Sequence, residues 1–346
     1  MPSSRRHPTL AALMVSGLLT AGCTAVSATD EPAVDNNGVG TTIGDEIADD
    51  QAASSTTVAT VDEEPEPERP AIVTPGDARA LITPTGVVVP VAGFSDAGYA
   101  IMTPCGNDGI VSWGTPLNDI QIVLDPGHGG DVETGAQGPN GLVERDLNLA
   151  VAKRTANLLG QRQISVVLTR TANYRVPLAV RAEIANRLEA AAIVSIHHNA
   201  PEGVPSPTPG TEVFVQKDVE ESRRLGGTIY EAVVDALEPF DVAWQTAPDA
   251  GVLEVLNNEG EDTYGMVRRP EMPGVLVELG YLANPAEAEL FATDEYVEVA
   301  SLALADGIEA WLLSDAEGTG FVAEPRIFIP TSGTGGAGGC VDPALE

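Results

Sequence analysis

The sequence predicts an α/β fold, in which a mainly parallel twisted sheet carries helices on both faces and follows a short β-rich segment. Residues 119–313 alternate short β-branched runs with segments whose apolar residues recur at helical spacing. Such alternation is typical of a helix-covered parallel sheet. The chain has 346 residues, 43% of them apolar, which allows one large or two modest domains with tails.

Five apolar runs are expected to form the strands of this sheet. They are residues 120–125, 164–169, 191–196, 211–216 and 274–279. The run at 211–216 alternates polar and apolar residues, which places it nearer an edge. Helices are expected at 144–159, 177–191, 222–237 and 294–313. Asn284 and Pro285 are expected to begin a further helix, as N-cap and first-turn proline.

The first 22 residues are predicted to be an export signal. Arg5 and Arg6 precede an apolar or small run at 9–21, which is too short to cross a bilayer that needs about 20 residues. The run ends in Leu-Thr-Ala-Gly-Cys and resembles the bacterial lipobox, so we expect cleavage before Cys23 and a lipid on that cysteine. The alternative is an ordinary secretory signal. We expect an exported chain that contacts the membrane through this anchor only.

Four further segments follow the signal. Residues 23–75 form a predicted disordered linker, because 24–68 hold 12 acidic residues and no lysine or arginine. Residues 76–118 carry short β-rich runs broken by proline and glycine, and 119–315 form the main domain. The Gly- and Pro-rich residues 316–346 are expected to be a loose C-terminal extension.

Two cysteines, Cys105 and Cys340, lie on opposite sides of the main domain. Export favours oxidation, so we expect a disulfide that ties the two flanks together. Two free thiols are the alternative.

The charge of the chain excludes two classes of partner. The formal net charge is −33, from 51 acidic and 18 basic residues. Nucleic-acid binding needs a basic stripe, and docking on anionic lipid needs positive charge. The excess of acidic over basic residues is interpreted as a solvated acidic surface.

Three of the four histidines are placed at predicted strand ends. His128 follows a strand in LDPGHGG, and His197 and His198 follow another in SIHHNA. The carboxyl ends of parallel strands collect ligands at one edge of a sheet, so these motifs could meet around one metal. A single histidine at such a place is more often a hydrogen-bonded structural residue.

Two glutamates complete the candidate site. A catalytic zinc takes three protein ligands and keeps one position open. Glu144, at the start of the helix that returns from the His128 loop, is the candidate third ligand, with plain helix capping as the alternative. Glu278 is a lone carboxylate in an apolar strand, a placement that suits general acid–base work beside a metal-bound water.

The motifs of this chain, in their order along the sequence, resemble those of zinc-dependent N-acetylmuramoyl-L-alanine amidases. These enzymes cut bacterial peptidoglycan and share a phosphorylase/hydrolase-like fold. The resemblance covers about 119–313 and is carried by IVLDPGHGG, the Glu144 motif, LTR followed by Arg181 and Ala185–Asn186, VSIHHNA, GTEVF and VLVELGYLANPAE.

The resemblance also implies roles for individual residues. One Zn²⁺ would be held by His128, Glu144 and His197, and Glu278 would be the catalytic glutamate. His198 and Asn199 would either touch substrate or support a ligand.

The implied reaction is hydrolysis of the amide between N-acetylmuramic acid and L-alanine by a zinc-activated water. Some members of the family insert an inhibitory helix over the site, and residues 201–210 are too short and Pro-rich for one. The alternatives are a zinc carboxypeptidase or deacylase on the same fold, or a silent wall-binding lipoprotein. We expect a monomer that faces the cell wall, with peptidoglycan as its partner. Residues 76–118 have two open interpretations, a wall-targeting module or a packing strap.

Overall fold

The computed structural model describes residues 74–200, 203–330 and 336–346. The predicted export signal at 1–22, its Cys23 and nearly all of the linker at 23–75 lie outside these ranges. Within the described part of the chain, no helix is both long enough and apolar enough to cross a bilayer.

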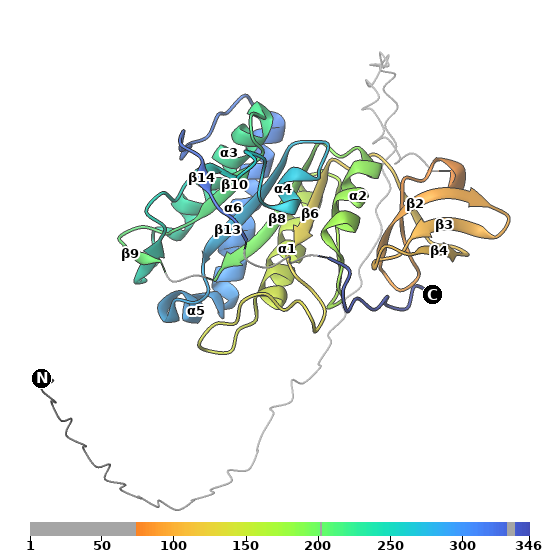
Figure 1. Ribbon diagram of the computed structural model, residues 1–346, viewed down its shortest axis with the longest axis horizontal. Coiled ribbons are helices and arrows are strands. Elements are labelled where there is room, and N and C mark those ends of the chain that lie inside the picture. The colour runs from red at the N-terminus through yellow and green to blue at the C-terminus, as the bar shows by residue number, and fades with distance from the viewer. Residues whose placement is uncertain (1–73, 201–202, 331–335) are drawn as a thin grey trace, which may run out of the picture. The chain divides into compact units, whose positions relative to one another are not determined.

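A seven-stranded sheet is the centre of the main domain (Figure 1). Its strands, in spatial order, are β14 (Arg326–Ile327), β12 (Val252–Leu256), β10 (Glu212–Val215), β13 (Gly274–Tyr281), β8 (Ala192–Asn199), β6 (Ile122–Pro126) and β7 (Val166–Leu168). Every neighbouring pair is parallel except β10 and β13, which are antiparallel. The prediction of a mainly parallel sheet is confirmed.

Helices cover both faces of this sheet because alternate strand residues point to opposite sides. In β6, Ile122 and Leu124 pack into one core and Val123 into the other. The first face is covered by α1 (Glu144–Gln161), α3 (Glu220–Leu237) and α6 (Asp294–Leu313), and the second by α2 (Leu178–Leu188) and α4 (Gly265–Arg268). The predicted helix at Asn284 is α5 (Pro285–Phe291), and the Asn284 side chain accepts a hydrogen bond from the Ala286 amide.

Two expectations about this sheet are wrong. The strand at 211–216 is not near an edge, because β12 and β14 lie beyond it. The C-terminal extension is not loose throughout, because it supplies β14, which pairs in parallel with β12. Both errors have one cause: the apolar stretch Val252–Leu256, which was not identified as a strand, covers one side of β10 and offers its own free side to β14.

The β-rich segment forms a separate antiparallel sheet in the order β4-β3-β2-β1-β5. A single 3₁₀ turn (Pro75–Asp77) precedes it, and its strands are β1 (Ala80–Ile82), β2 (Val88–Ser95), β3 (Gly98–Met102), β4 (Asp108–Val111) and β5 (Thr115–Leu117). Its apolar face packs on α2 and on the chain that leads into α2, through Tyr174, Val176 and Val180. A short antiparallel pair, β9 (Val204–Ser206) and β11 (Trp244–Thr246), lies apart from both sheets.

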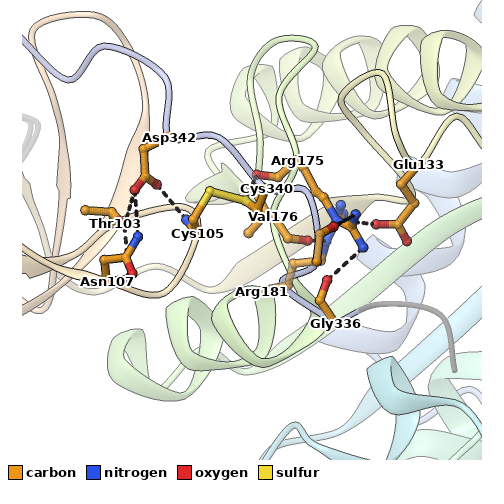
Figure 2. Close-up of a disulfide and its surroundings, with 11 residues drawn as sticks. Thr103, Cys105, Asn107, Glu133, Arg175, Val176, Arg181, Gly336, Cys340 and Asp342 are labelled. Carbon is orange, nitrogen blue, oxygen red and sulfur yellow. Dashed lines mark hydrogen bonds and ion pairs between the residues drawn. A yellow bond between two sulfur atoms is a disulfide. The ribbon is translucent and has the colours of Figure 1, made fainter.

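A disulfide between Cys105 and Cys340 joins the small sheet to the C-terminal residues (Figure 2). We call residues 336–346 the C-terminal strap. The Asp342 carboxylate accepts hydrogen bonds from the Thr103 hydroxyl, the Cys105 amide and the Asn107 side chain. The strap is therefore fixed to the small sheet by one covalent bond and by a carboxylate with several donors.

A buried ion pair ties β6 to α2 directly below the His128 loop. Arg181 Nη1 donates to Asp125 Oδ1 at 2.7 Å, and both side chains are 1% exposed. Thr169 and Ser195 also donate to the Asp125 carboxylate. Burial alone would raise the pKa of Asp125, but the charge of Arg181 and these hydrogen bonds outweigh it and lower the pKa. Asp125 is therefore ionised and stabilises the fold.

We expect Asp125→Asn to lower the free energy of unfolding by about 3–5 kcal/mol, because it leaves the Arg181 charge buried without its partner. Urea denaturation of the purified protein at neutral pH measures this. The contribution is present above the unfolded pKa of aspartate and is lost as the pH falls through the lowered folded pKa. Glu298→Gln, which breaks the exposed pair with Arg154, is the control and should leave the midpoint almost unchanged. An equal midpoint for the two variants would contradict this reading.

Candidate metal centre

Three side chains from distant parts of the chain converge at the carboxyl edge of β6 and β8. Glu144 Oε1 lies 3.1 Å from His128 Nε2 and 3.0 Å from His197 Nδ1. The potential ligand atoms of the three residues all lie within 4.8 Å of one another. The predicted ligand set is thus brought together, and it is the one such group found in the described ranges.

The chain around His128 is shaped to bring the two histidines close. His128 follows β6 with φ of 62°, in the left-handed region that is unfavourable for a residue with a side chain. The turn is held from below, because Arg181 donates to the carbonyl oxygens of Pro126 and His128. At Gly127, a β-carbon would lie 2.1 Å from Cε1 of the His197 ring, so only glycine leaves room for that imidazole.

Glu144 is the first residue of α1 and is 3% exposed. Its Oε2 accepts the Ala136 amide at 2.7 Å, and its Oε1 accepts the Asn148 side chain at 3.2 Å. Burial works to raise the pKa of Glu144, but its hydrogen bonds with His128 and His197 outweigh burial and hold the pKa well below its usual range. The group is a fixed carboxylate between two imidazoles, which is the donor chemistry that zinc takes at a catalytic site.

A cavity of about 200 Å³ opens beside these ligands. His128, His197, Glu133, Tyr264, Met266 and Glu278 are among its lining residues. Glu278 comes from β13 and pairs in register with His197 on one side and with Glu212 on the other. Its Oε2 is buried and has no hydrogen-bond partner among the described residues.

The charge around Glu278 favours its protonated form. Burial, together with the charges of Glu144 and Glu212, raises the pKa of Glu278 well above its usual range. A raised pKa makes a carboxylate a stronger base once it is ionised, which suits general acid–base work. Because Glu278 lines the cavity, its carboxyl group is placed to meet a reacting water or amine there.

The side chains of His198 and Asn199 do not join the ligand cluster, although the His198 backbone amide donates to Glu144 Oε1 at 3.3 Å. His198 points to the opposite face of β8, where its Nδ1 lies 2.7 Å from Asn148 Oδ1 and its Nε2 lies 2.8 Å from the Tyr296 hydroxyl. Complete burial lowers the pKa of His198 to about 3, so its ring is neutral. Because Asn148 also donates to Glu144, His198 supports a ligand from behind and does not face the cavity.

Asn199 belongs to a second cavity of about 370 Å³, which Tyr264 links to the first by lining both. The Asn199 side chain donates to Glu212 Oε2 at 2.8 Å. Arg326, from β14, donates to the other Glu212 oxygen and pairs with Asp249. The C-terminal extension therefore builds one wall of this cavity.

Sequence reasoning missed several of these residues. Glu133, Tyr264 and Arg326 stand in stretches without a recognisable motif, and only the fold brings them to the cavities. Asn148 carried a usable signal, because it lies four residues after Glu144 and so shares its face of the helix.

Comparison with known proteins gives a consistent picture. A family model described as N-acetylmuramoyl-L-alanine amidase matches residues 122–310. The uncharacterized protein YqiI of Bacillus subtilis is 34% identical over 198 residues, which is 57% of this chain and 86% of YqiI. N-acetylmuramoyl-L-alanine amidase AmiC of Neisseria meningitidis is 28% identical over 221 residues, and the match spans 55% of this chain but only 52% of AmiC.

A solved structure is also similar. The crystal structure of an N-acetylmuramoyl-L-alanine amidase from Clostridium difficile 630 is 29% identical, with a TM-score of 0.49, and the match covers 58% of this chain and 100% of that one.

We expect Gly135→Ala to weaken metal binding at this centre, measured with zinc as the probe, by about tenfold or more, because it disturbs the candidate ligands directly. A β-carbon at this position would lie 2.4 Å from Glu144 Oε2 and 2.6 Å from His128 Cδ2. Gly141→Ala is a matched control, because its φ of 87° resembles the 70° of Gly135 but nothing lies within 4 Å of the added carbon. Chelator competition measures the zinc affinity of both variants. Equal zinc affinities of the two variants would contradict a direct effect of the added carbon on the ligands.

Proposed function

We propose that this chain, which belongs to the N-acetylmuramoyl-L-alanine amidase family and is an amidase of peptidoglycan, works through one zinc ion held by His128, Glu144 and His197. In this proposal Glu278 is the general base. The bond cleaved joins the lactyl group of N-acetylmuramic acid to the L-alanine of the stem peptide.

One observation carries the proposal. Two imidazoles and a carboxylate, contributed by the end of β6, the start of α1 and the end of β8, have their ligand atoms within 4.8 Å of one another. Glu278, whose Oε2 is buried without a partner among the described residues, lines the same cavity as the two imidazoles. A cation would offset the negative charge of Glu144, and two imidazoles with one carboxylate form a donor set that suits zinc.

When bound, zinc would polarise the scissile carbonyl and lower the pKa of a water molecule to about 7. The positive charge of the bound metal would lower the raised pKa of Glu278, so its carboxylate would take the proton of the attacking water and deliver it to the departing amine. Tyr264, Met266 and Leu276 would give the cavity an apolar wall that limits competing water. Asn148 and the Ala136 amide would hold Glu144 in place throughout, because both donate to its carboxylate.

The place of action is the cell wall, outside the cytoplasm, and the disulfide suits that compartment. We further propose that residues 1–22 direct export and that a lipid on Cys23 holds the chain at the membrane. The acidic segment at 23–75 would then tether the catalytic domain at a distance from the bilayer. We propose that the chain acts as a monomer.

Glu278→Gln should bind zinc as the wild type does but lose cleavage by about 10²- to 10⁴-fold, because the amide cannot take a proton from water. Purified sacculi are incubated with each variant, and the products are identified by mass spectrometry. His128→Ala should instead lose bound zinc, which elemental analysis detects. Glu295→Gln, on the exposed start of α6, is the matched control.

The products decide between this reaction and its competitors. Free stem peptides that begin with L-alanine support the amidase, released single amino acids would indicate a carboxypeptidase, and acyl groups a deacylase. Full turnover by Glu278→Gln would remove the assigned role of that residue. Absence of zinc-dependent products from the wild type would leave a silent wall-binding protein.

Cys23→Ala, expressed as the full chain in a bacterium that lipidates exported proteins, should move the protein from the membrane fraction to the soluble exported fraction. Immunoblots of the two fractions measure this. Unchanged membrane association would contradict the lipid anchor.

A further inference from the structure

We propose that Glu133 and Arg175 are positioning residues for the metal ligand His128, and that the C-terminal strap maintains this arrangement by holding Arg175. The inference rests on the proposed zinc site and adds to it a chain of contacts that ends at the Cys105–Cys340 disulfide. The family match ends at residue 310, so the strap lies outside it.

The first contact in this chain is between His128 and Glu133. The Nε2 atom of His128 faces Glu144, and its Nδ1 atom is buried without a hydrogen-bond partner among the described residues. The nearest acidic atom to Nδ1 is Glu133 Oε1, at 3.9 Å. A histidine that binds a metal through one nitrogen usually donates the other N–H to a carboxylate, which fixes the ring and its tautomer. A movement of about 1 Å would make this contact a hydrogen bond of ordinary length.

Arg175 is the partner of Glu133. Arg175 Nε lies 3.1 Å from Glu133 Oε2, and the two side chains are 11% and 17% exposed. Both of these atoms are buried and neither makes a hydrogen bond of good geometry within the ranges described. Three adjoining polar side chains are thus close but imperfectly paired, as expected for a network that tightens when a cation binds beside it.

The strap fixes Arg175 at its other end (Figure 2). Arg175 Nη1 donates to the Gly338 carbonyl oxygen at 2.5 Å, and Nη2 donates to that of Gly336 at 2.7 Å. The Cys340 Sγ atom lies 3.7 Å from the Arg175 carbonyl oxygen. A planar guanidinium with two donors on the strap and one facing Glu133 can take few orientations.

The disulfide and Asp342 anchor the strap to the small sheet, so they also determine where the two carbonyl oxygens stand. If the disulfide is lost, Arg175 loses a fixed support and Glu133 loses a fixed partner. We expect the loss of the disulfide to lower zinc affinity without unfolding the protein, because none of these contacts belongs to the central sheet. A purely structural role of the strap would lower stability and leave zinc affinity unchanged.

The test measures zinc affinity by chelator competition and, separately, the thermal midpoint of the metal-free protein. Glu133→Gln should weaken zinc binding by about 10- to 100-fold. Asp131→Asn, an exposed acid in the same loop, is the matched control and should bind zinc as the wild type does. The midpoints of the two metal-free variants should be similar. Wild-type affinity in Glu133→Gln would overturn the proposal.

A double-mutant cycle tests the connection to the strap. Cys105→Ser with Cys340→Ser should weaken zinc binding in the wild type but add little in the Glu133→Gln background, because both changes interrupt one network. Arg175→Lys serves if the cysteine variant does not fold, since lysine keeps the charge but lacks the planar fork that reaches the strap and Glu133 together. Additive losses, or no loss from either change, would show that the strap does not act through Glu133.

The zinc measurements separate this inference from the proposed function. A wild type that binds zinc but does not cleave peptidoglycan would refute the function and leave the positioning role standing. A wild type that cleaves peptidoglycan, together with unchanged zinc affinity in Glu133→Gln, would support the function and refute the positioning role. A wild type that binds no zinc would overturn both.

Discussion

The whole site depends on two buried guanidinium groups that hold one turn of backbone. Arg181 donates to the Asp125 carboxylate and to the carbonyl oxygens of Pro126 and His128, and Arg170 donates to those of Pro126 and Gly127. These bonds fix the chain where His128 takes its left-handed conformation. Strain of this kind persists only where the surroundings over-determine it. Without the two arginines, the first histidine would have no fixed position relative to Glu144 and His197.

Carboxylates outnumber cations at the cavity, and this imbalance explains the chemistry of the site. Glu278 lies opposite Glu212 on the neighbouring strand, the charge of Glu144 also acts on it, and Arg326 pairs with Glu212. Burial, together with the charges of Glu144 and Glu212, raises the pKa of Glu278 and favours its protonated form. The two imidazoles instead lower the pKa of Glu144 and keep it ionised. Two acids of the same type therefore take opposite roles because their neighbours differ, as in other enzymes with paired carboxyl groups.

Sequence patterns predicted the parts of this molecule that local physics determines. Strand–helix alternation predicted the fold class. The motifs around His128, His197 and Glu278 predicted three side chains that line one cavity, and the Glu144 motif predicted the carboxylate that lies between the two imidazoles. The two-residue period of a strand also separates His197 from His198: β8 continues to Asn199, so the two rings must point to opposite faces. The β-strand at Val252–Leu256 was missed, and with it the true position of β10. No local pattern predicts contacts between residues that lie far apart in sequence. This is why the sequence did not reveal Glu133, Arg175 and Arg326, whose partners lie up to about 160 residues away.

The bond between Cys105 and Cys340 closes a covalent ring that contains the entire central sheet and the six α-helices of the described residues. Outside the cytoplasm, proteases are a common hazard, and a loop such as the one that leads from β10 to α3 is the usual place for a first cut. In an open chain that cut would let two fragments diffuse apart. Here a single cleavage between the two cysteines leaves both fragments joined by the disulfide. The cut ends therefore stay at high effective concentration, and the fold can persist after the backbone is broken.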